Sequence, residues 1–214
     1  MTDDRDLLLA WRTGDAAAGQ QLIERHLEPI HRFFSNKVSG ATDDLVQKTF
    51  LACVEAVEGF EGRASFRSYV FGIARNVLHR HYRENWRDQH HGFDPLVVSM
   101  SSVAADDRSP ADRVTDREEQ RLLLRALRAL PLELQTLLEL AYWEGLPDRE
   151  LAEILEVPAG TLKSRLRKAR QQLEQLMGTL ASSPGLLQSS RLTLDAWAAG
   201  IRDHTGIEGG GKRR

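Results

Sequence analysis

Apolar residues recur every three or four positions along most of this chain, which is the spacing of amphipathic helices, and strand-like alternation is nearly absent. In the first half this pattern predicts helices at about 4–12, 16–37, 42–57 and 65–87. Pro29 predicts a kink or a break inside the second of them. The apolar stripes of the second and third helices are predicted to be buried, namely Leu22, Ile23, Leu27, Ile30, Phe33 and Phe34, and Leu45, Val46, Phe50, Leu51, Val54 and Val57.

The helical period is interrupted at 88–112, where Gly, Pro, Ser and Asp residues predict an acidic, flexible linker. Beyond it, two further apolar stripes end at Pro131 and Gly145, and short helices are predicted at 148–155 and 159–177. The chain is therefore predicted to be all-α, with two small helical domains joined by a flexible linker and a helix-turn-helix in the second. The expected divisions are a first domain, a linker, a second domain and a C-terminal extension, at 1–90, 91–112, 113–178 and 179–214.

Composition and charge exclude several classes of protein. The 214 residues include 29 Lys and Arg and 31 Asp and Glu, a formal net charge of −2, so a uniformly basic nucleic-acid binder is excluded while local basic surfaces are not. No apolar run approaches the ~20 residues that span a bilayer, and the acidic N-terminus does not resemble a secretory signal. Cys53 has no second cysteine to pair with and is expected to be a small buried residue. His79 and His81, two residues apart, fall on different helix faces, so no metal site or cofactor is predicted.

The most specific pattern lies at 146–166, where two short helices and a tight turn form the spacing of a helix-turn-helix. Pro158 opens the second of these helices, where its missing N–H costs nothing. One sector of that helix is apolar and consists of Leu162, Leu166, Ala169 and Leu173. The opposite side is a polar and cationic front. The front consists of Lys163, Ser164, Arg165, Arg167, Lys168, Arg170 and Gln171. Such a helix suits major-groove reading, and the alternative is a solvated basic face on an ordinary surface helix.

Arginines alternate with aromatic residues at 62–91, a pattern that suits single-stranded DNA because cations hold phosphates and rings stack on exposed bases. The alternative is that Phe66, Tyr69 and their apolar neighbours face the core while the arginines are solvated. For most of these aromatics the second interpretation is favoured, whereas Tyr82 and Trp86, at the polar end, are predicted to be more open.

Two blocks of the chain, in this order, resemble the extracytoplasmic-function (ECF) RNA polymerase sigma factors of the sigma-70 family. The sequences DDLVQKTFL at 43–51 and FEGRASFRSYVFGIARN at 60–76 are similar to region 2 of that family. The sequences ALPLELQTLL at 129–138 and AGTLKSRLRKAR at 159–170 are similar to region 4. The order of the blocks, the linker between them and the length also fit, and the resemblance covers roughly 5–178.

The resemblance implies three contact surfaces and three partners. The core-polymerase surface would consist of Asp43, Asp44, Gln47, Lys48 and Leu51. The surface for the −10 element of promoter DNA would consist of Arg63, Ser65, Phe66, Arg75, Asn76, Arg80 and Arg83. The surface for the −35 element would be the cationic front defined above. The partners would be the RNA polymerase core, through its β′ clamp helices and β flap, promoter DNA, and an anti-sigma factor.

Four positions depart from the family's pattern. Lys48 stands where the family usually has an acid, so an altered polymerase contact is expected at this position, and Tyr69 replaces a common Trp. Gly72 replaces a larger residue inside a helix, at a cost of ~1 kcal/mol. Glu156 occupies the helix-turn-helix turn, where the family favours Gly, and a positive φ there would cost about 1 kcal/mol.

The chain is therefore interpreted as a non-enzymatic bacterial sigma factor that directs core polymerase to specific promoters and assists DNA melting. One alternative is a stand-alone helix-turn-helix regulator, which would need a dimer and a palindromic site. The other is a protein-interaction module with vestigial DNA binding. The expected location is the cytoplasm, or the membrane if an anti-sigma partner is held there. In the extension, Leu194, Trp197 and Ile201 have the spacing of a docking helix, and a disordered tail is the alternative.

Overall fold

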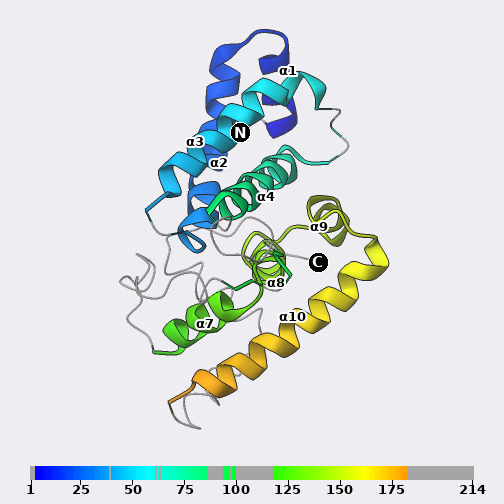
Figure 1. The fold of residues 1–214 in the computed structure, drawn as a ribbon. Helices are drawn as coiled ribbons and strands as arrows, with labels where there is room; N and C mark the ends of the chain where they lie inside the picture. The colour runs from blue at the N-terminus through cyan, green and yellow to red at the C-terminus, as the bar shows by residue number, and fades with distance from the viewer. Residues whose placement is uncertain are drawn as a thin grey trace. The chain divides into compact units, whose positions relative to one another are not determined.

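The computed structural model describes residues 3–38, 40–60, 62, 64–85, 94–96, 98–99 and 118–182 (Figure 1). Every named element in these ranges is helical, so the all-α prediction is confirmed. The described residues form two compact units, one containing α1–α4 and α9 and the other containing α7, α8, η2 and α10. Most of the predicted linker, and the C-terminal extension with its proposed docking helix, lie outside the described residues.

Among the described residues, five α-helices and a 3-10 turn make up the first unit: α1 (Asp4–Arg12), α2 (Ala16–Ser35), α3 (Thr42–Ala56), η1 (Val57–Gly59), α4 (Phe66–Asn85) and α9 (Asp148–Ile154). Asp15 caps α2 by accepting hydrogen bonds from the amides of Ala17 and Ala18, at 3.0 and 3.1 Å. The helix continues through Pro29, so the alternative of a break is wrong. Burial of Leu22 and Phe34, on either side of the proline, offsets the ~3 kcal/mol that a proline costs inside a helix.

The core of the first unit forms where α2, α3 and α4 pack on one another. The largest fully buried apolar side chains of this unit are Leu22, Ile30, Phe34, Leu45, Phe71, Leu78 and, from α9, Leu151. Three residues predicted to be buried are exposed instead, with exposed fractions of 46% for Leu27, 57% for Leu51 and 45% for Val54. At ~100° per residue the buried positions of α3 share one sector, and Leu51 and Val54 fall outside it.

Tyr82 is 3% exposed, so the prediction that it lies open at the polar end of its helix is wrong. Its hydroxyl donates a hydrogen bond to the backbone carbonyl of Lys37, just beyond the end of α2. Tyrosine buries its ring readily when its hydroxyl finds such a partner. Lys37 is itself buried, with Nζ 3.9 Å from the ring centre of Phe33 and 3.0 Å from the Phe33 carbonyl oxygen. Trp86 lies outside the described residues.

The second unit contains α7 (Glu118–Ala129), α8 (Leu132–Leu138), the π-helical turn η2 (Glu139–Trp143) and α10 (Ala159–Leu180). Its core brings together Leu122, Leu123, Ala126, Leu127, Leu130, Leu134, Leu138, Ala169, Leu173 and Met177. The carbonyls of Val98 and Pro95 accept hydrogen bonds from the amides of Leu132 and Glu133, at 2.9 and 3.0 Å. These bonds satisfy amides that the start of α8 leaves without intrahelical partners, so two residues of the predicted linker are engaged with α8.

Candidate nucleic-acid interface

The second helix of the predicted helix-turn-helix, α10, has a buried back and an exposed front, as its sequence predicts. Leu162, Ala169 and Leu173 are fully buried, and Leu166 is half-buried. In the cationic front, Arg165 is half-buried. The other members are exposed, namely Lys163, Ser164, Arg167, Lys168, Arg170 and Gln171. The amphipathic division of this helix is therefore confirmed, whereas its contact with DNA stays a prediction.

Two members of the cationic front also have partners within the second unit. The hydroxyl of Ser164 donates to the carbonyl of Thr161 at 2.8 Å, and the guanidinium carbon of Arg170 lies 4.9 Å from the ring centre of Tyr142. The second contact has the geometry of a cation–π interaction, which holds Arg170 against η2. Lys163, Arg167 and Lys168 extend into solvent beside them and are the cations best placed for phosphates or base edges.

The first helix of the pair and the turn after it also match the prediction. Leu151 and Ile154 of α9 are buried, as is Leu155 directly after the helix. The amide of Val157 bonds to the carbonyl of Ala152 at 3.0 Å, which closes the helix end, and α10 begins directly after Pro158. Glu156 lies in this turn with a φ of 54°, so the positive φ considered from the sequence is present at a non-glycine residue.

The residues predicted to hold −10 DNA do not all gather on one face of α4. Asn76, Arg80 and Arg83 are all exposed and share a single helix face, because they are spaced by four and then three residues. Arg75 points elsewhere: it is 8% exposed, and its Nη1 lies 3.9 Å from a carboxylate oxygen of Glu156. Arg63 lies outside the described residues.

Phe66 belongs to the core, as the alternative interpretation of this segment favours, with 3% of its surface exposed. Its ring centre lies 5.4 Å from that of His26, 6.4 Å from Trp11 and 6.5 Å from Phe60. The Phe60 ring in turn stacks on Tyr69 at 4.3 Å. Burial raises the pKa of the Tyr69 hydroxyl, whose oxygen has no hydrogen-bond partner among the described residues.

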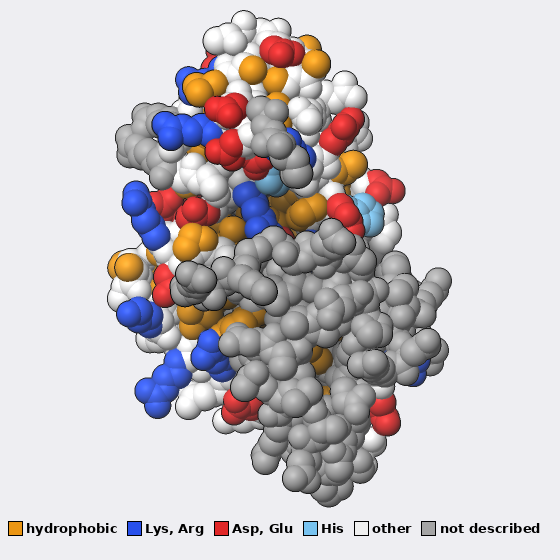
Figure 2. Space-filling model, turned by 180° about the vertical axis from the view of Figure 1, so that it is seen from behind, with side chains coloured by type: hydrophobic (Ala, Val, Ile, Leu, Met, Phe, Trp, Pro, Cys, Tyr) orange, Lys and Arg blue, Asp and Glu red, His pale blue; other side chains and the backbone are white. Residues whose placement is uncertain are grey.

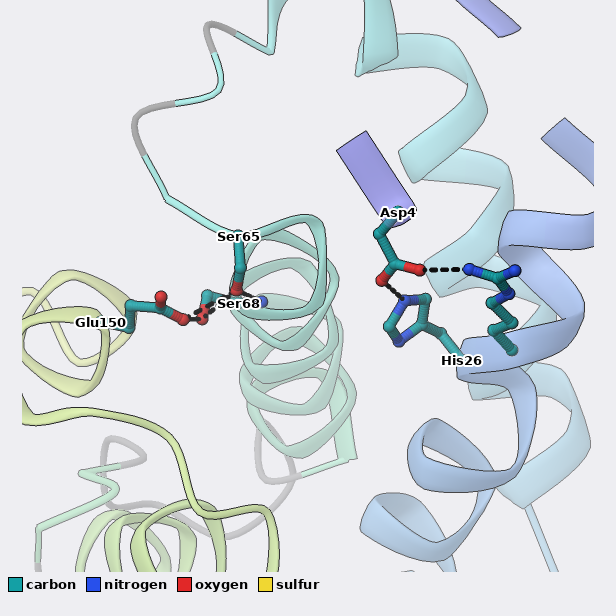
Figure 3. Close-up of polar contacts among 6 residues, drawn as sticks. Asp4, His26, Ser65, Ser68 and Glu150 are labelled. Carbon is teal, nitrogen blue, oxygen red and sulfur yellow. Dashed lines mark hydrogen bonds and ion pairs between the residues drawn. The ribbon is translucent and has the colours of Figure 1, made fainter. Parts of the chain in front are cut away.

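Ser65 and Ser68, at the start of α4, share one carboxylate oxygen of Glu150 in α9 (Figure 3). The Ser65 hydroxyl donates to Glu150 Oε2 at 2.7 Å and accepts from the Ser68 amide at 3.1 Å, so it also caps α4. Sequence reasoning missed Glu150, because a contact between residues 85 positions apart leaves no periodic signal. A nucleic-acid phosphate would have to displace this carboxylate to reach Ser65.

The predicted core-polymerase residues of α3 form one solvent-facing side of the helix, opposite the side that it buries. Asp43, Asp44, Gln47, Lys48 and Leu51 are all exposed and fall in one sector, while Leu45, Val46, Thr49, Phe50 and Cys53 are buried in the other. Burial raises the pKa of the Cys53 thiol to about 12, in keeping with a small core residue.

Lys48, which departs from the family's pattern, is paired with Asp44 on the same face of α3. Its Nζ lies 2.7 Å from Asp44 Oδ2, four residues earlier on the helix. Both side chains are more than half exposed, so this ion pair contributes little to stability. Its effect is instead to offset the charge of one of the two acids at the start of the predicted polymerase surface; the other, Asp43, lies 3.4 Å from Nε2 of His31.

On the face drawn in Figure 2, Lys and Arg side chains are interspersed with Asp and Glu side chains rather than gathered by sign. This mixture fits the formal net charge of −2. No helix in the part of the chain that the structure describes is long and apolar enough to cross a membrane.

Sequence comparison places two family models on the chain. The model of Sigma-70 region 2 matches residues 22–88, and the model of Sigma-70, region 4, matches residues 120–173. An ECF RNA polymerase sigma-E factor of Haemophilus influenzae is 26% identical over 176 residues, which are 80% of this chain and 93% of that protein. A protein of the same description from Escherichia coli is 24% identical over 182 residues, covering 80% and 92%.

Solved structures share the fold. CnrH, in complex with the cytosolic domain of CnrY, aligns with a TM-score of 0.58 and 22% identity, over 82% of this chain and 97% of that chain. The sigma factor RpoE of Bartonella quintana, in complex with the anti-sigma factor NepR, aligns with a TM-score of 0.56 and 21% identity, over 74% and 96%. Both alignments extend over most of each chain, so the helical fold of this chain is shared with both.

Proposed function

This chain belongs to the ECF group of the sigma-70 family of RNA polymerase sigma factors, and we propose that its three exposed surfaces recruit core polymerase, open the −10 element and bind the −35 element. The observation that carries the proposal is the presence, in one chain, of a region 2 match and a region 4 match, each with a cationic helix face open to solvent. A stand-alone helix-turn-helix regulator would not need the region 2 match.

The exposed face of α3 is the proposed contact with the β′ clamp helices. Leu51 and Val54 support this assignment, because exposed apolar side chains beside a charged face are typical of a protein–protein contact. The Lys48–Asp44 pair is the feature in which this contact would differ from that of other family members.

The face of α4 that carries Asn76, Arg80 and Arg83 is the proposed support for the −10 strand. A base is read only after it leaves the stack, so DNA opening requires cations that hold a single strand beside a recognition segment. The segment proposed to read the −10 element is 59–65, which immediately precedes α4 and ends at Ser65. Asn76 adds an amide that donates and accepts hydrogen bonds beside the two arginines.

The cationic front of α10 is the proposed reader of the −35 major groove, and the β flap is the proposed polymerase contact of this domain. Neither DNA contact needs to be tight alone, because polymerase holds both domains on one promoter and raises the effective concentration of the second contact. This bipartite arrangement is compatible with a chain of slightly negative net charge.

We assign 1–90 to the polymerase-binding and −10-binding domain, 91–112 to the linker and 113–178 to the −35-binding domain. The protein would act in the cytoplasm, without cofactor or covalent chemistry of its own. An anti-sigma partner, membrane-bound or not, is proposed because the structural relatives CnrH and RpoE were solved in complexes with CnrY and NepR.

The proposal is tested by transcribing a library of linear templates with randomised upstream sequence, using Escherichia coli core polymerase with and without the full chain. We expect transcripts that depend on the chain and share two upstream elements. A chain that shifts duplex DNA without core polymerase, and adds no transcripts to it, would be a stand-alone regulator and would contradict the proposal.

A further inference from the structure

Arg12, the last residue of α1, donates hydrogen bonds to the backbone just beyond α3. Its Nη1 donates to the carbonyl oxygen of Phe60 at 3.2 Å, and its Nη2 donates to that of Glu58 at 3.0 Å. Carbonyls at the end of a helix lack intrahelical partners and carry the negative end of its dipole, so a guanidinium is favoured there by both charge and geometry. Arg12 is thus a C-terminal cap for α3 and η1 that is supplied by another helix.

The side chain of Phe60 is held from a second direction. Its ring stacks on Tyr69 at 4.3 Å with an interplanar angle of 30°, and meets the buried ring of Phe66 edge-on at 79°. Aromatic contacts of this kind favour one ring position over others. The backbone of Phe60 is therefore fixed by Arg12 of α1, and its ring is fixed by α4.

The helix that carries Arg12, α1, is itself held against α2 by contacts at both of its ends. Asp4, in its first turn, pairs with Arg25 and His26 of α2 (Figure 3). At the other end, Trp11 lies so close to Gly19 that a Cβ on this glycine would meet the indole at 2.6 Å. Arg12 therefore projects from a helix that is anchored on α2 at both ends.

Phe60, which Arg12 contacts, lies at the beginning of the segment that leads to α4. Five residues later Ser65 caps α4, so the segment proposed to read the −10 element is anchored at Phe60 on one side and at Ser65 on the other. We infer that Arg12 is a positioning residue for −10 recognition, which fixes the backbone from which this segment departs. The inference rests on the proposed function of 59–65. It also concerns a helix outside residues 22–88, which the region 2 model matches.

The test compares Arg12→Ala, Arg12→Lys and the wild-type full chain, each with core polymerase on templates selected from the library and re-randomised at either the −10 or the −35 element. Because Arg12 is exposed, its truncation leaves no cavity and no buried charge. We expect base discrimination at the −10 element to fall roughly tenfold in Arg12→Ala, because that factor corresponds to the free energy of one charge-assisted hydrogen bond. Discrimination at the −35 element should not change, and Arg12→Lys, which keeps a donor, should be intermediate.

Arg5→Ala is the matched control, because it removes the same charge from an exposed position on the same helix and should behave like the wild type. Amide hydrogen exchange of the full chain without polymerase gives a second measurement. Peptides that span 57–66 should exchange faster in Arg12→Ala than in Arg5→Ala.

Unchanged −10 preferences in Arg12→Ala would overturn the inference. So would an equal loss on every template, because a merely structural role reduces activity without changing base preference. If the wild type itself produced no chain-dependent transcripts, the proposed function would fail, while the exchange measurement would still decide whether Arg12 fixes this segment.

Discussion

The Nε2 atom of His26 lies 2.7 Å from Oδ2 of Asp4, and this contact joins the first turn of α1 to the middle of α2. Nη1 of Arg25 lies 3.0 Å from the other oxygen of the same carboxylate. His26 is 6% exposed, and burial lowers its pKa below the ordinary 6.5, against the opposing effect of Asp4 and with smaller contributions from Arg67 and Arg25. The neutral ring can satisfy this geometry by donating its Nε2 proton to Asp4.

This lowered pKa predicts how stability depends on pH. The unfolded chain takes up a proton on His26 near pH 6.5, whereas the folded chain resists it, so the stabilisation is complete above pH 6.5 and is lost as the pH falls through the folded-state pKa. His26→Gln keeps a donor for Asp4 but does not titrate. The thermal midpoint should therefore fall less steeply below pH 6.5 in His26→Gln than in the wild type, and parallel curves for the two proteins would contradict the prediction.

Two helical glycines should respond to alanine in opposite directions. A Cβ at Gly72 in α4 would meet nothing within 4 Å, so Gly72→Ala should raise the free energy of unfolding by ~1 kcal/mol through helix propensity. A Cβ at Gly19 would lie 2.6 Å from the Trp11 indole, so Gly19→Ala should lower the thermal midpoint despite the same gain in propensity. Denaturation of the two variants side by side checks both signs, and a gain in both would show that Trp11 moves aside freely.

Two tyrosines of α4 should respond differently to loss of the hydroxyl. Tyr82→Phe removes the donor to the Lys37 carbonyl and should destabilise by about 1–2 kcal/mol. Tyr69→Phe removes an oxygen that has no partner among the described residues, so it should be neutral or stabilising and is the matched control. Equal losses in chemical denaturation would show that removing a hydroxyl costs the same with or without this hydrogen bond, and would contradict the prediction.

Helix positions and the two faces of α10 can be predicted from the sequence because both depend on a local period of 3.6 residues. The exposure of Val54 cannot, because apolar composition alone does not distinguish a residue that faces the core from one that faces another protein. Leu51 belongs to the apolar stripe as well, and only the family resemblance places it on an exposed surface. The prediction for Tyr82 is wrong for a related reason: its neighbours along the chain are polar, but its partner is a carbonyl 45 residues earlier.

The contacts of Arg12 and Glu150 in the candidate site could not be predicted from the sequence for the same reason. Both are charged, exposed or half-buried residues, and an arginine at a helix end or a glutamate in a short helix gives no pattern of its own. Their partners depend on how the helices pack on one another, and the family resemblance gives the order of the helices but not their individual contacts. The positive φ of Glu156, by contrast, is predictable because the turn geometry is local and the family favours Gly there.

That turn gives a further prediction. A left-handed conformation costs a non-glycine residue about 1 kcal/mol, so Glu156→Gly should raise the free energy of unfolding by up to that amount. The variant also loses the 3.9 Å contact with Arg75, but the Glu156 carboxylate is 71% exposed and the pair is worth little. Glu174→Gly, at an exposed position inside α10, should be destabilising instead, and the opposite order of thermal midpoints would refute the assignment of strain to Glu156.

The cationic front of α10 predicts a measurable salt dependence of promoter binding. A cation that neutralises a phosphate releases a counterion, so each such contact contributes about 0.9 to the slope of log K against log salt concentration. Arg167→Ala and Lys168→Ala, assayed as holoenzyme on a promoter fragment between about 50 and 200 mM salt, should each reduce that slope by roughly one.

The matched control for this measurement is Arg125→Ala, which removes the same charge from an exposed position on α7 in the same unit. It should leave the slope unchanged, because α7 lies outside the helix-turn-helix. If all three variants reduced the slope equally, the effect would come from net charge and not from contacts of α10 with phosphates. A variant of the front that weakened binding only for certain −35 sequences, with the slope intact, would instead identify its side chain as a reader of base edges.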